Sequence, residues 1–146
     1  MNKKKSAILL FLTCLTFFAF AQVKKPVHHS TAVAASMARG KIVYNNICLA
    51  CHMADGNGVP TMNPPIANTE YVLGDKPRLI KIVLNGFKED VQINGQTFSN
   101  NMTPHSDLTD RQIADVLTYV RKSFGNKAGG IMAAEVKNVR ALNNAK

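Results

Sequence analysis

The stretch Cys48-Leu49-Ala50-Cys51-His52 is the most informative motif in this sequence. The spacing Cys-x-x-Cys-His is typical of the covalent attachment site of a c-type haem. Two thiols separated by two residues can each add to one vinyl group at the porphyrin edge, and the adjacent histidine can offer a neutral ring nitrogen to the iron. We therefore expect one covalently bound haem c, attached to Cys48 and Cys51 and ligated by His52, with the rest of the chain packed around it.

Three other sites can contain a Cys-x-x-Cys pair: a redox-active dithiol, half of a zinc site, or an ordinary disulfide. A dithiol of the thioredoxin type follows a strand in a βαβ pattern, and this sequence has no such pattern. Zinc needs two more ligands at regular spacing, and the remaining histidines, His28, His29 and His105, form no convincing second pair. The haem interpretation is therefore favoured over all three.

The amino-terminal residues have the features of an export signal. A basic Lys3-Lys4-Lys5 precedes the apolar run Ala7–Phe20, and Ala19-Phe20-Ala21 fits a small-x-small cleavage site. We expect residues 1–21 to be a signal peptide and the protein to be exported to the periplasm or cell envelope. Lipid attachment at Cys14 is a weak alternative because the preceding residues match poorly. Retention as an anchor is another, although the run is shorter than the about 20 residues of a membrane span.

The predicted mature chain keeps 125 of the 146 residues, enough for one domain with one hydrophobic core. Its two cysteines are both in the haem motif, so it has no disulfide framework. Loss of three lysines with the signal lowers the formal charge from +9 to +6. This surplus favours a charged docking face for redox partner proteins, and no basic run is dense enough to indicate nucleic-acid binding. We expect a monomer without a membrane span in its mature form.

Helix signals dominate the mature chain. Between Thr31 and Ile47, small and apolar residues recur at helical spacing and lead into the haem motif. Gly40 in this stripe costs about 1 kcal/mol of helix stability relative to alanine, which suggests that another helix crosses closely there. We expect residues 22–32 to be a linker, residues 33–126 to be the folded domain, and residues 127–146 to be an extension with one short helix.

Further elements follow the motif. We expect a helix over 75–85 that begins with a proline in its first turn and ends at a glycine, and a loop or small hairpin over 91–98 around an Asn-Gly turn. The clearest helix starts at Thr109, which forms a capping box with Gln112, and its apolar stripe extends to Phe124.

The second axial ligand of a haem iron decides between electron transfer and small-molecule chemistry. Met102 is the best candidate, because it lies fifty residues beyond His52 in an irregular segment just before the last strong helix. The alternatives are a Met102 used only for packing, and His105 as a second histidine ligand. The rigid segment containing Pro64 either holds a carbonyl against Nδ1–H of His52 or is a simple surface loop.

With these residues, the chain resembles a class I monohaem cytochrome c over roughly residues 37–126. The resemblance is carried by the helix with Gly40 and Tyr44, the haem motif, the glycines and prolines after it, Met102, and the stretch from Ile113 to Arg121. It implies an all-α cytochrome c fold of three to five helices around one haem.

The resemblance also implies that the first and last helices of the domain cross beside the haem, with Gly40 and Tyr44 near Val116 and Tyr119. It implies that the carbonyl of Pro64 accepts a hydrogen bond from His52. One departure concerns Met102, because the family usually has Met followed directly by Pro, whereas Thr103 intervenes here.

The function implied by the resemblance is one-electron transfer between redox proteins, such as an oxidase, a reductase or a dehydrogenase. We expect such a carrier and not an enzyme. The alternatives are a haem enzyme such as a peroxidase, which needs an open iron position and distal acid–base groups, and a haem-based redox or gas sensor.

Overall fold

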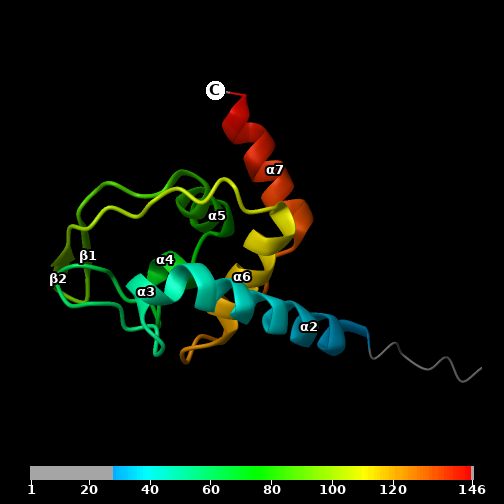
Figure 1. Ribbon diagram of the computed structural model, residues 1–146, viewed down its shortest axis with the longest axis horizontal. Coiled ribbons are helices and arrows are strands. Elements are labelled where there is room, and N and C mark those ends of the chain that lie inside the picture. Colours follow the sequence, from blue (N-terminus) through cyan, green and yellow to red (C-terminus); the bar gives the residue numbers. More distant parts are fainter. Residues whose placement is uncertain (1–27, 146) are drawn as a thin grey trace, which may run out of the picture.

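Two long helices cross at the centre of the molecule, α2 (His28–Val43) and α6 (Asp110–Lys122) (Figure 1). The computed structural model describes residues 28–145, so the predicted signal peptide and residues 22–27 of the predicted linker lie outside the described part. The other elements are η2 (Tyr44–Cys48), α3 (Leu49–His52), α4 (Glu70–Leu73), α5 (Lys76–Asn85), β1 (Val91–Ile93), β2 (Gln96–Phe98) and α7 (Ala133–Asn144). The predicted all-α class is confirmed, with one small hairpin added.

Gly40 is the point where α2 and α6 meet. A β-carbon at this residue would lie 2.0 Å from the carbonyl oxygen of Asp115 and 2.9 Å from Cβ of Tyr119. Because only a glycine permits this approach, the predicted close crossing at Gly40 is confirmed. One turn further along, the ring of the buried Tyr44 lies 5.5 Å from that of Tyr119.

The helical segment that begins with α2 changes its winding before the haem motif. Residues Tyr44–Cys48 form a π-helical turn, η2, and the last residues of the motif continue as the short α3. A π-helical turn contains about one residue more than an α-helical turn, so it rotates the following side chains around the helix axis. The motif therefore faces a direction that the α-helical spacing of the preceding stripe does not predict.

The start of α6 is as predicted, but its end is not. The Thr109 hydroxyl accepts a hydrogen bond from N–H of Gln112, and the Gln112 side chain in turn accepts from N–H of Thr109, which confirms the capping box. The helix ends at Lys122, whereas the apolar stripe predicted helix up to Phe124. Phe124 has a φ of 57° and leaves the helix, and its ring packs 5.2 Å from that of Tyr44.

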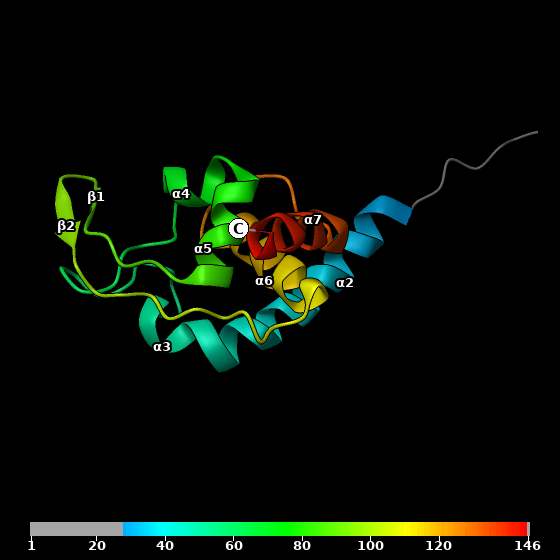
Figure 2. The same ribbon diagram turned by 90° about the horizontal axis from the view of Figure 1, so that it is seen from above.

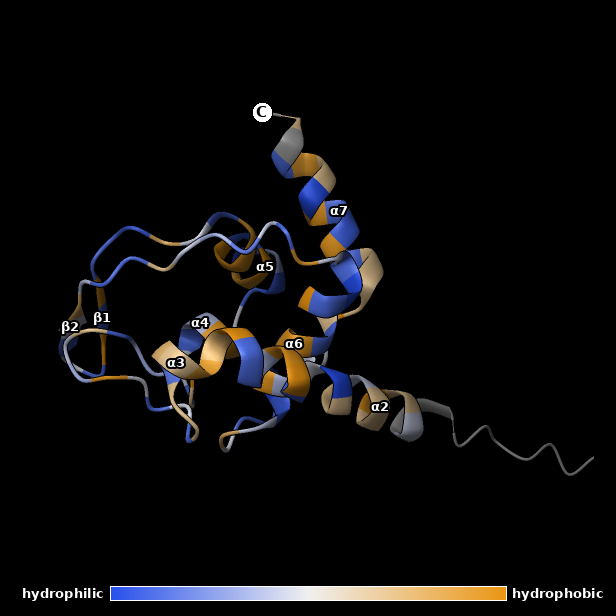
Figure 3. Ribbon diagram, in the orientation of Figure 1, coloured by the Kyte–Doolittle hydropathy of each residue, from blue (hydrophilic) through white to orange (hydrophobic). Residues whose placement is uncertain are grey.

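The middle of the chain holds α5 and the hairpin. Asp75 caps α5 by accepting from N–H of Arg78, and strongly apolar residues alternate with polar ones along α5 and α6 (Figure 3). Strands β1 and β2 are antiparallel around Asn94-Gly95, both with positive φ, as the Asn-Gly signal predicts. The hairpin lies at the opposite end of the molecule from the start of α2 (Figure 2).

The domain boundaries differ from the expected ones at both ends. Helix α2 already begins at His28, so residues 28–32 are helix and not linker. Beyond residue 126, α7 packs against α5 and α6, and its Val136 and Val139 are buried in the common core. The predicted extension is therefore part of the folded domain. No helix within residues 28–145 combines the length and the apolar character that a membrane span requires.

Candidate functional site: a haem pocket

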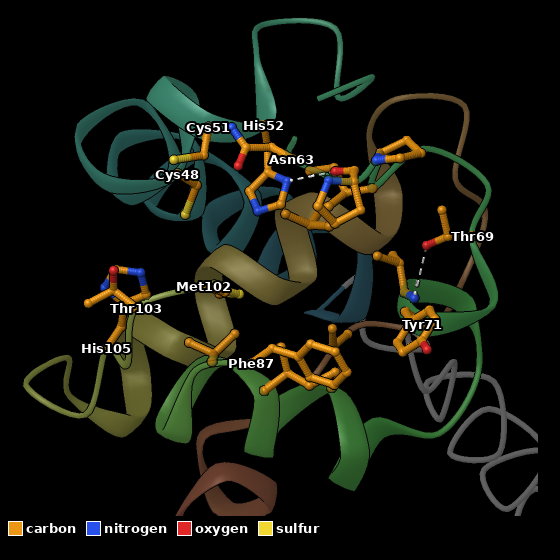
Figure 4. A pocket seen from close by; sticks show the side chains of 18 of the residues that line it. Cys48, Cys51, His52, Asn63, Thr69, Tyr71, Phe87, Met102, Thr103 and His105 are labelled. Carbon is orange, nitrogen blue, oxygen red and sulfur yellow. Dashed lines mark hydrogen bonds between the residues drawn. The ribbon is translucent and has the colours of Figure 1, made fainter. Parts of the chain in front are cut away.

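A cavity of about 280 Å³ lies between the haem motif, α5, α6 and the segment that contains Met102. Its walls are mostly apolar and include Leu79, Val83, Val116, Leu117 and Val120. All the side chains that the sequence singled out for cofactor binding line this one cavity: Cys48, Cys51, His52, Pro64, Met102 and His105. Figure 4 shows the ring of His52 above the cavity and the sulfur of Met102 pointing into it, with His105 to one side next to Thr103.

The orientation of the His52 ring is fixed by a hydrogen bond of its Nδ1. Its Nδ1 lies 3.1 Å from the carbonyl oxygen of Pro64, and because a carbonyl can only accept, Nδ1 carries the proton. Burial lowers the pKa of His52, the bond to Pro64 opposes this shift, and the nearby His105 adds to it. The imidazole is therefore neutral at neutral pH, and its Nε2 keeps a free lone pair, which is the form that a metal ion requires.

Two contacts position His52 and the segment that supplies the Pro64 carbonyl. Gly58 has a φ of 67°, and a β-carbon there would lie 2.2 Å from the carbonyl oxygen of Asn63 and 2.7 Å from that of Pro64. The Tyr44 hydroxyl donates to the carbonyl of Met53, the residue directly after His52, at 2.6 Å. The histidine and its acceptor are thus both tied to the turn that follows the motif.

The cysteines do not have the properties of a reactive dithiol. Cys48 is partly buried, Cys51 is exposed, and no disulfide joins them. Burial and the neighbouring Cys51 raise the pKa of Cys48 to about 11, whereas redox-active Cys-x-x-Cys pairs have a lowered thiol pKa. Among residues 28–145, no group of three or more histidine, cysteine or acidic side chains could hold a metal ion by itself. These findings disfavour the dithiol and zinc alternatives.

Met102 belongs to a segment that is pinned to the end of α5. Its N–H donates to the carbonyl of Phe87 at 2.8 Å, and its carbonyl accepts from N–H of Phe87 at 3.0 Å. A β-carbon at the adjacent Gly86 would lie 2.3 Å from the Met102 carbonyl oxygen. Three residues further on, N–H of His105 donates to the carbonyl of Val83 at 2.9 Å. The intervening Thr103 is exposed and does not prevent Met102 from lining the cavity.

Sequence reasoning missed several residues that shape the site. Asn126 is buried and its side chain donates to the carbonyl of Ile66, which lines the cavity, and to that of Val120, while it accepts from N–H of Asn68. The sequence indicated only that Asn126 ends a helix. Phe87 and its pairing with Met102 were also missed, because no local pattern signals a single bridge between residues far apart in the chain.

The donor set and the cavity fit a covalently attached haem. Two thiols at the required spacing lie beside a neutral imidazole, and a thioether lies across an apolar space from that ring. These are the groups that attach and ligate the iron of a c-type haem, and an apolar wall suits the porphyrin.

Comparison with known proteins agrees with this chemistry. The family described as Cytochrome c matches residues 37–124. A cytochrome c-552 of Thermus thermophilus is 30% identical over 118 residues, which cover 75% of this chain and 79% of that protein. The cytochrome c subunit of the quinone alcohol dehydrogenase of Gluconobacter oxydans is 33% identical over 111 residues, covering 69% of this chain and 22% of the subunit.

The fructose dehydrogenase cytochrome subunit of Gluconobacter japonicus is also similar, with 33% identity over 107 residues that cover 70% of this chain and 22% of the subunit. This chain therefore spans about a fifth of the length of these dehydrogenase subunits. The family match begins at Met37 and ends at Phe124, so it includes the crossing helices, the haem motif and Met102. The chain belongs to the cytochrome c family of electron carriers, with Cys48-Leu49-Ala50-Cys51-His52 as its attachment motif for haem c.

Proposed function

We propose that this protein is exported to the periplasm or cell envelope and carries single electrons between redox proteins there. In this proposal Cys48 and Cys51 form the thioether bonds to the haem, and His52 and Met102 are the axial ligands. The observation that carries the proposal is that these four side chains line a single apolar cavity. When bound, haem c supplies reversible one-electron chemistry.

The protein's own residues favour electron transfer with little rearrangement. Pro64 fixes the orientation of His52 through Nδ1, and the paired backbones of Phe87 and Met102 hold the thioether. A neutral sulfur ligand raises the reduction potential relative to a second histidine, and it leaves no open position for a substrate. The mostly apolar walls of the cavity suit the porphyrin. For these reasons we infer a carrier and not a peroxidase or a gas sensor.

The relatives and the expected charge of the mature chain favour redox proteins as the partners. Several relatives are named as cytochrome subunits of dehydrogenases, which favours a dehydrogenase as the electron donor. The mature chain is expected to carry a net charge of +6, which would attract an acidic partner face and speed a brief encounter. We further propose that the carrier is a monomer.

The ferric absorption spectrum tests the assignment of Met102. A thioether ligand gives a weak sulfur-to-iron band in the far red, which we expect in the wild type. Met102→Ala should remove this band, lower the reduction potential and allow carbon monoxide to bind the reduced protein readily. His105→Ala serves as the matched control and should leave the band unchanged. Survival of the band in Met102→Ala, or its loss in His105→Ala, would overturn the assignment.

A further inference from the structure

Helix α7 lies outside the family match, which ends at Phe124, yet it is packed into the domain. Its Val136 and Val139 are buried against the core, and Glu135 in its first turn forms an ion pair of 2.9 Å with Lys76 at the start of α5. The helix is therefore anchored along the face that it presents to α5 and α6 (Figure 1). A helix fixed in this way can hold other parts of the chain.

One side chain of α7 holds the segment that follows Met102. The guanidinium of Arg140 donates to the carbonyl of Ser106 at 2.9 Å, to the carbonyl of Leu108 at 2.7 Å and to the carboxylate of Asp110 at 2.7 Å. Only 25% of the Arg140 side chain is exposed, so these charge-assisted bonds are partly shielded from water. Arg140 thus ties down the chain from four to eight residues beyond Met102.

A second side chain of α7 holds the other half of the Phe87–Met102 pair. Asn143 and Asn85 exchange two side-chain hydrogen bonds, of 3.1 and 2.6 Å. Asn85 is the last residue of α5 and is followed by Gly86, which lies against the Met102 carbonyl. Helix α7 therefore forms hydrogen bonds to both chain segments whose backbones pair at Phe87 and Met102.

We propose that Arg140 and Asn143 are positioning residues for the axial methionine, an inference that rests on the proposed ligation by Met102. The segment between β2 and α6, which carries Met102, has no helix or strand of its own. The position of a ligand on such a segment therefore depends on the contacts that fix the two ends of the segment. At Met102 the segment is paired with Phe87. Helix α7 holds the other end of the segment through Arg140, and it holds the chain before Phe87 through the contact of Asn143 with Asn85. In this role α7 opposes dissociation of the sulfur from the iron.

The test compares two variants that each remove a polar contact of α7. Arg140→Gln loses the contacts to residues 106–110, and Asn143→Ala loses the contact to Asn85. Lys76→Gln is the control, because it breaks the other ion pair of α7 without touching either segment of the Phe87–Met102 pair. The measurements on the haem-loaded protein are the rate of carbon monoxide binding to the reduced form, the far-red band of the ferric form, and amide hydrogen exchange of residues 103–108.

We expect carbon monoxide to bind at least tenfold faster to Arg140→Gln than to wild type, with a weaker far-red band and at least tenfold faster exchange of residues 103–108. Asn143→Ala should show the same changes to a smaller degree, and Lys76→Gln should stay within twofold of wild type. If Arg140→Gln and Lys76→Gln behave alike, α7 acts only on general stability and the inference is wrong, although Met102 can still be the ligand. A wild type without the far-red band overturns the ligand assignment and this inference together.

Discussion

Gly40 lies so close to Asp115 that a β-carbon on the glycine would be 2.0 Å from the carbonyl oxygen of the aspartate. This contact sets the distance between α2 and α6, and it lies one helical turn before Tyr44, whose ring packs against Tyr119 and Phe124. The haem motif follows on the same helical segment. The crossing therefore determines where the motif meets the rest of the domain.

Gly40→Ala should destabilise the protein. Alanine is favoured over glycine in a helix by about 1 kcal/mol, but the added methyl group would clash with backbone atoms that cannot move independently. Overpacking of this kind costs roughly 1–3 kcal/mol or more, so the net free energy of unfolding should fall. Denaturant unfolding of the haem-loaded protein measures this, with the exposed Lys41→Ala as a control within about 0.5 kcal/mol of wild type. An unchanged or higher stability of Gly40→Ala would show that the two helices can move apart freely.

The same crossing contains a carboxylate whose protonation should weaken the fold. Asp115 accepts from the Ser36 hydroxyl at 2.6 Å and from two guanidinium N–H groups of Arg39 at 2.6 and 2.9 Å. Burial by itself would raise the pKa of Asp115, but the hydrogen bonds from Arg39 and Ser36 and the charges of Arg39 and Arg111 outweigh it, so the pKa is lowered.

Because this carboxylate binds its proton less tightly in the folded state, it contributes stability above its ordinary pKa of about 3.9. That contribution should disappear as the pH falls through the lowered pKa of the folded state. We expect Asp115→Asn to have a lower melting temperature than wild type at pH 6, and the difference to shrink steadily below about pH 4. The exposed Asp90→Asn is the control. A difference that is the same at pH 6 and at pH 3 would contradict the role of the charge.

The turn after the haem motif offers a pair of matched glycines. Gly58 has a φ of 67° and abuts the carbonyls of Asn63 and Pro64, whereas Gly95 has a φ of 79° and no atom within 4 Å of a β-carbon. Alanine at either site should cost about 1–2 kcal/mol from backbone strain. Only Gly58→Ala should also displace the Pro64 carbonyl from His52.

A histidine ligand that loses the acceptor on Nδ1 becomes less basic and stabilises ferric iron less well. We therefore expect the reduction potential of Gly58→Ala to rise relative to Gly95→Ala, measured by potentiometric titration of the haem absorption. Equal potentials in the two variants would mean that the contact between His52 and Pro64 does not tune the iron.

Covalent attachment can be tested on the intact protein. We expect its mass to include one haem after denaturation and acetone extraction, because thioether bonds survive both treatments. Cys48→Ala combined with Cys51→Ala should lose the haem in the same test and should lose the native fold, since the apolar cavity walls then have nothing to pack against. Extraction of the haem from the wild type would rule out the thioether bonds.

Those parts of the fold with a local signature were predictable from the sequence. Gly40 in an apolar stripe indicated the helix crossing, the capping box at Thr109 marked the start of α6, and Asn94-Gly95 marked the hairpin. The short α4 was missed, although Thr69 caps it, because four residues are too few to show a helical period.

The parts that depend on long-range contacts were not predictable. Arg121 is buried and donates to the carbonyls of Val72 and Gly74, 49 and 47 residues earlier in the chain, and to the carbonyl of Gly129, 8 residues later. An arginine in the last turn of a helix is usually a solvent-exposed charge, so the sequence alone does not indicate that Arg121 is buried and links these segments. The packing of α7 on the domain is a similar case, because its apolar positions are few.

The π-helical turn η2 lies between the part of the helical segment that packs on α6 and the part that carries the haem motif. Upstream of this turn, the close approach of Gly40 to Asp115 of α6 fixes how α2 lies on α6, and the last residue of the turn, Cys48, begins the haem motif. Loss of one residue from this turn would rotate everything after it by about 100° around the helix axis while the crossing stayed in register. Because η2 begins at the buried Tyr44 of the core and ends at Cys48 of the haem motif, its extra residue sets the angle at which the motif leaves the core.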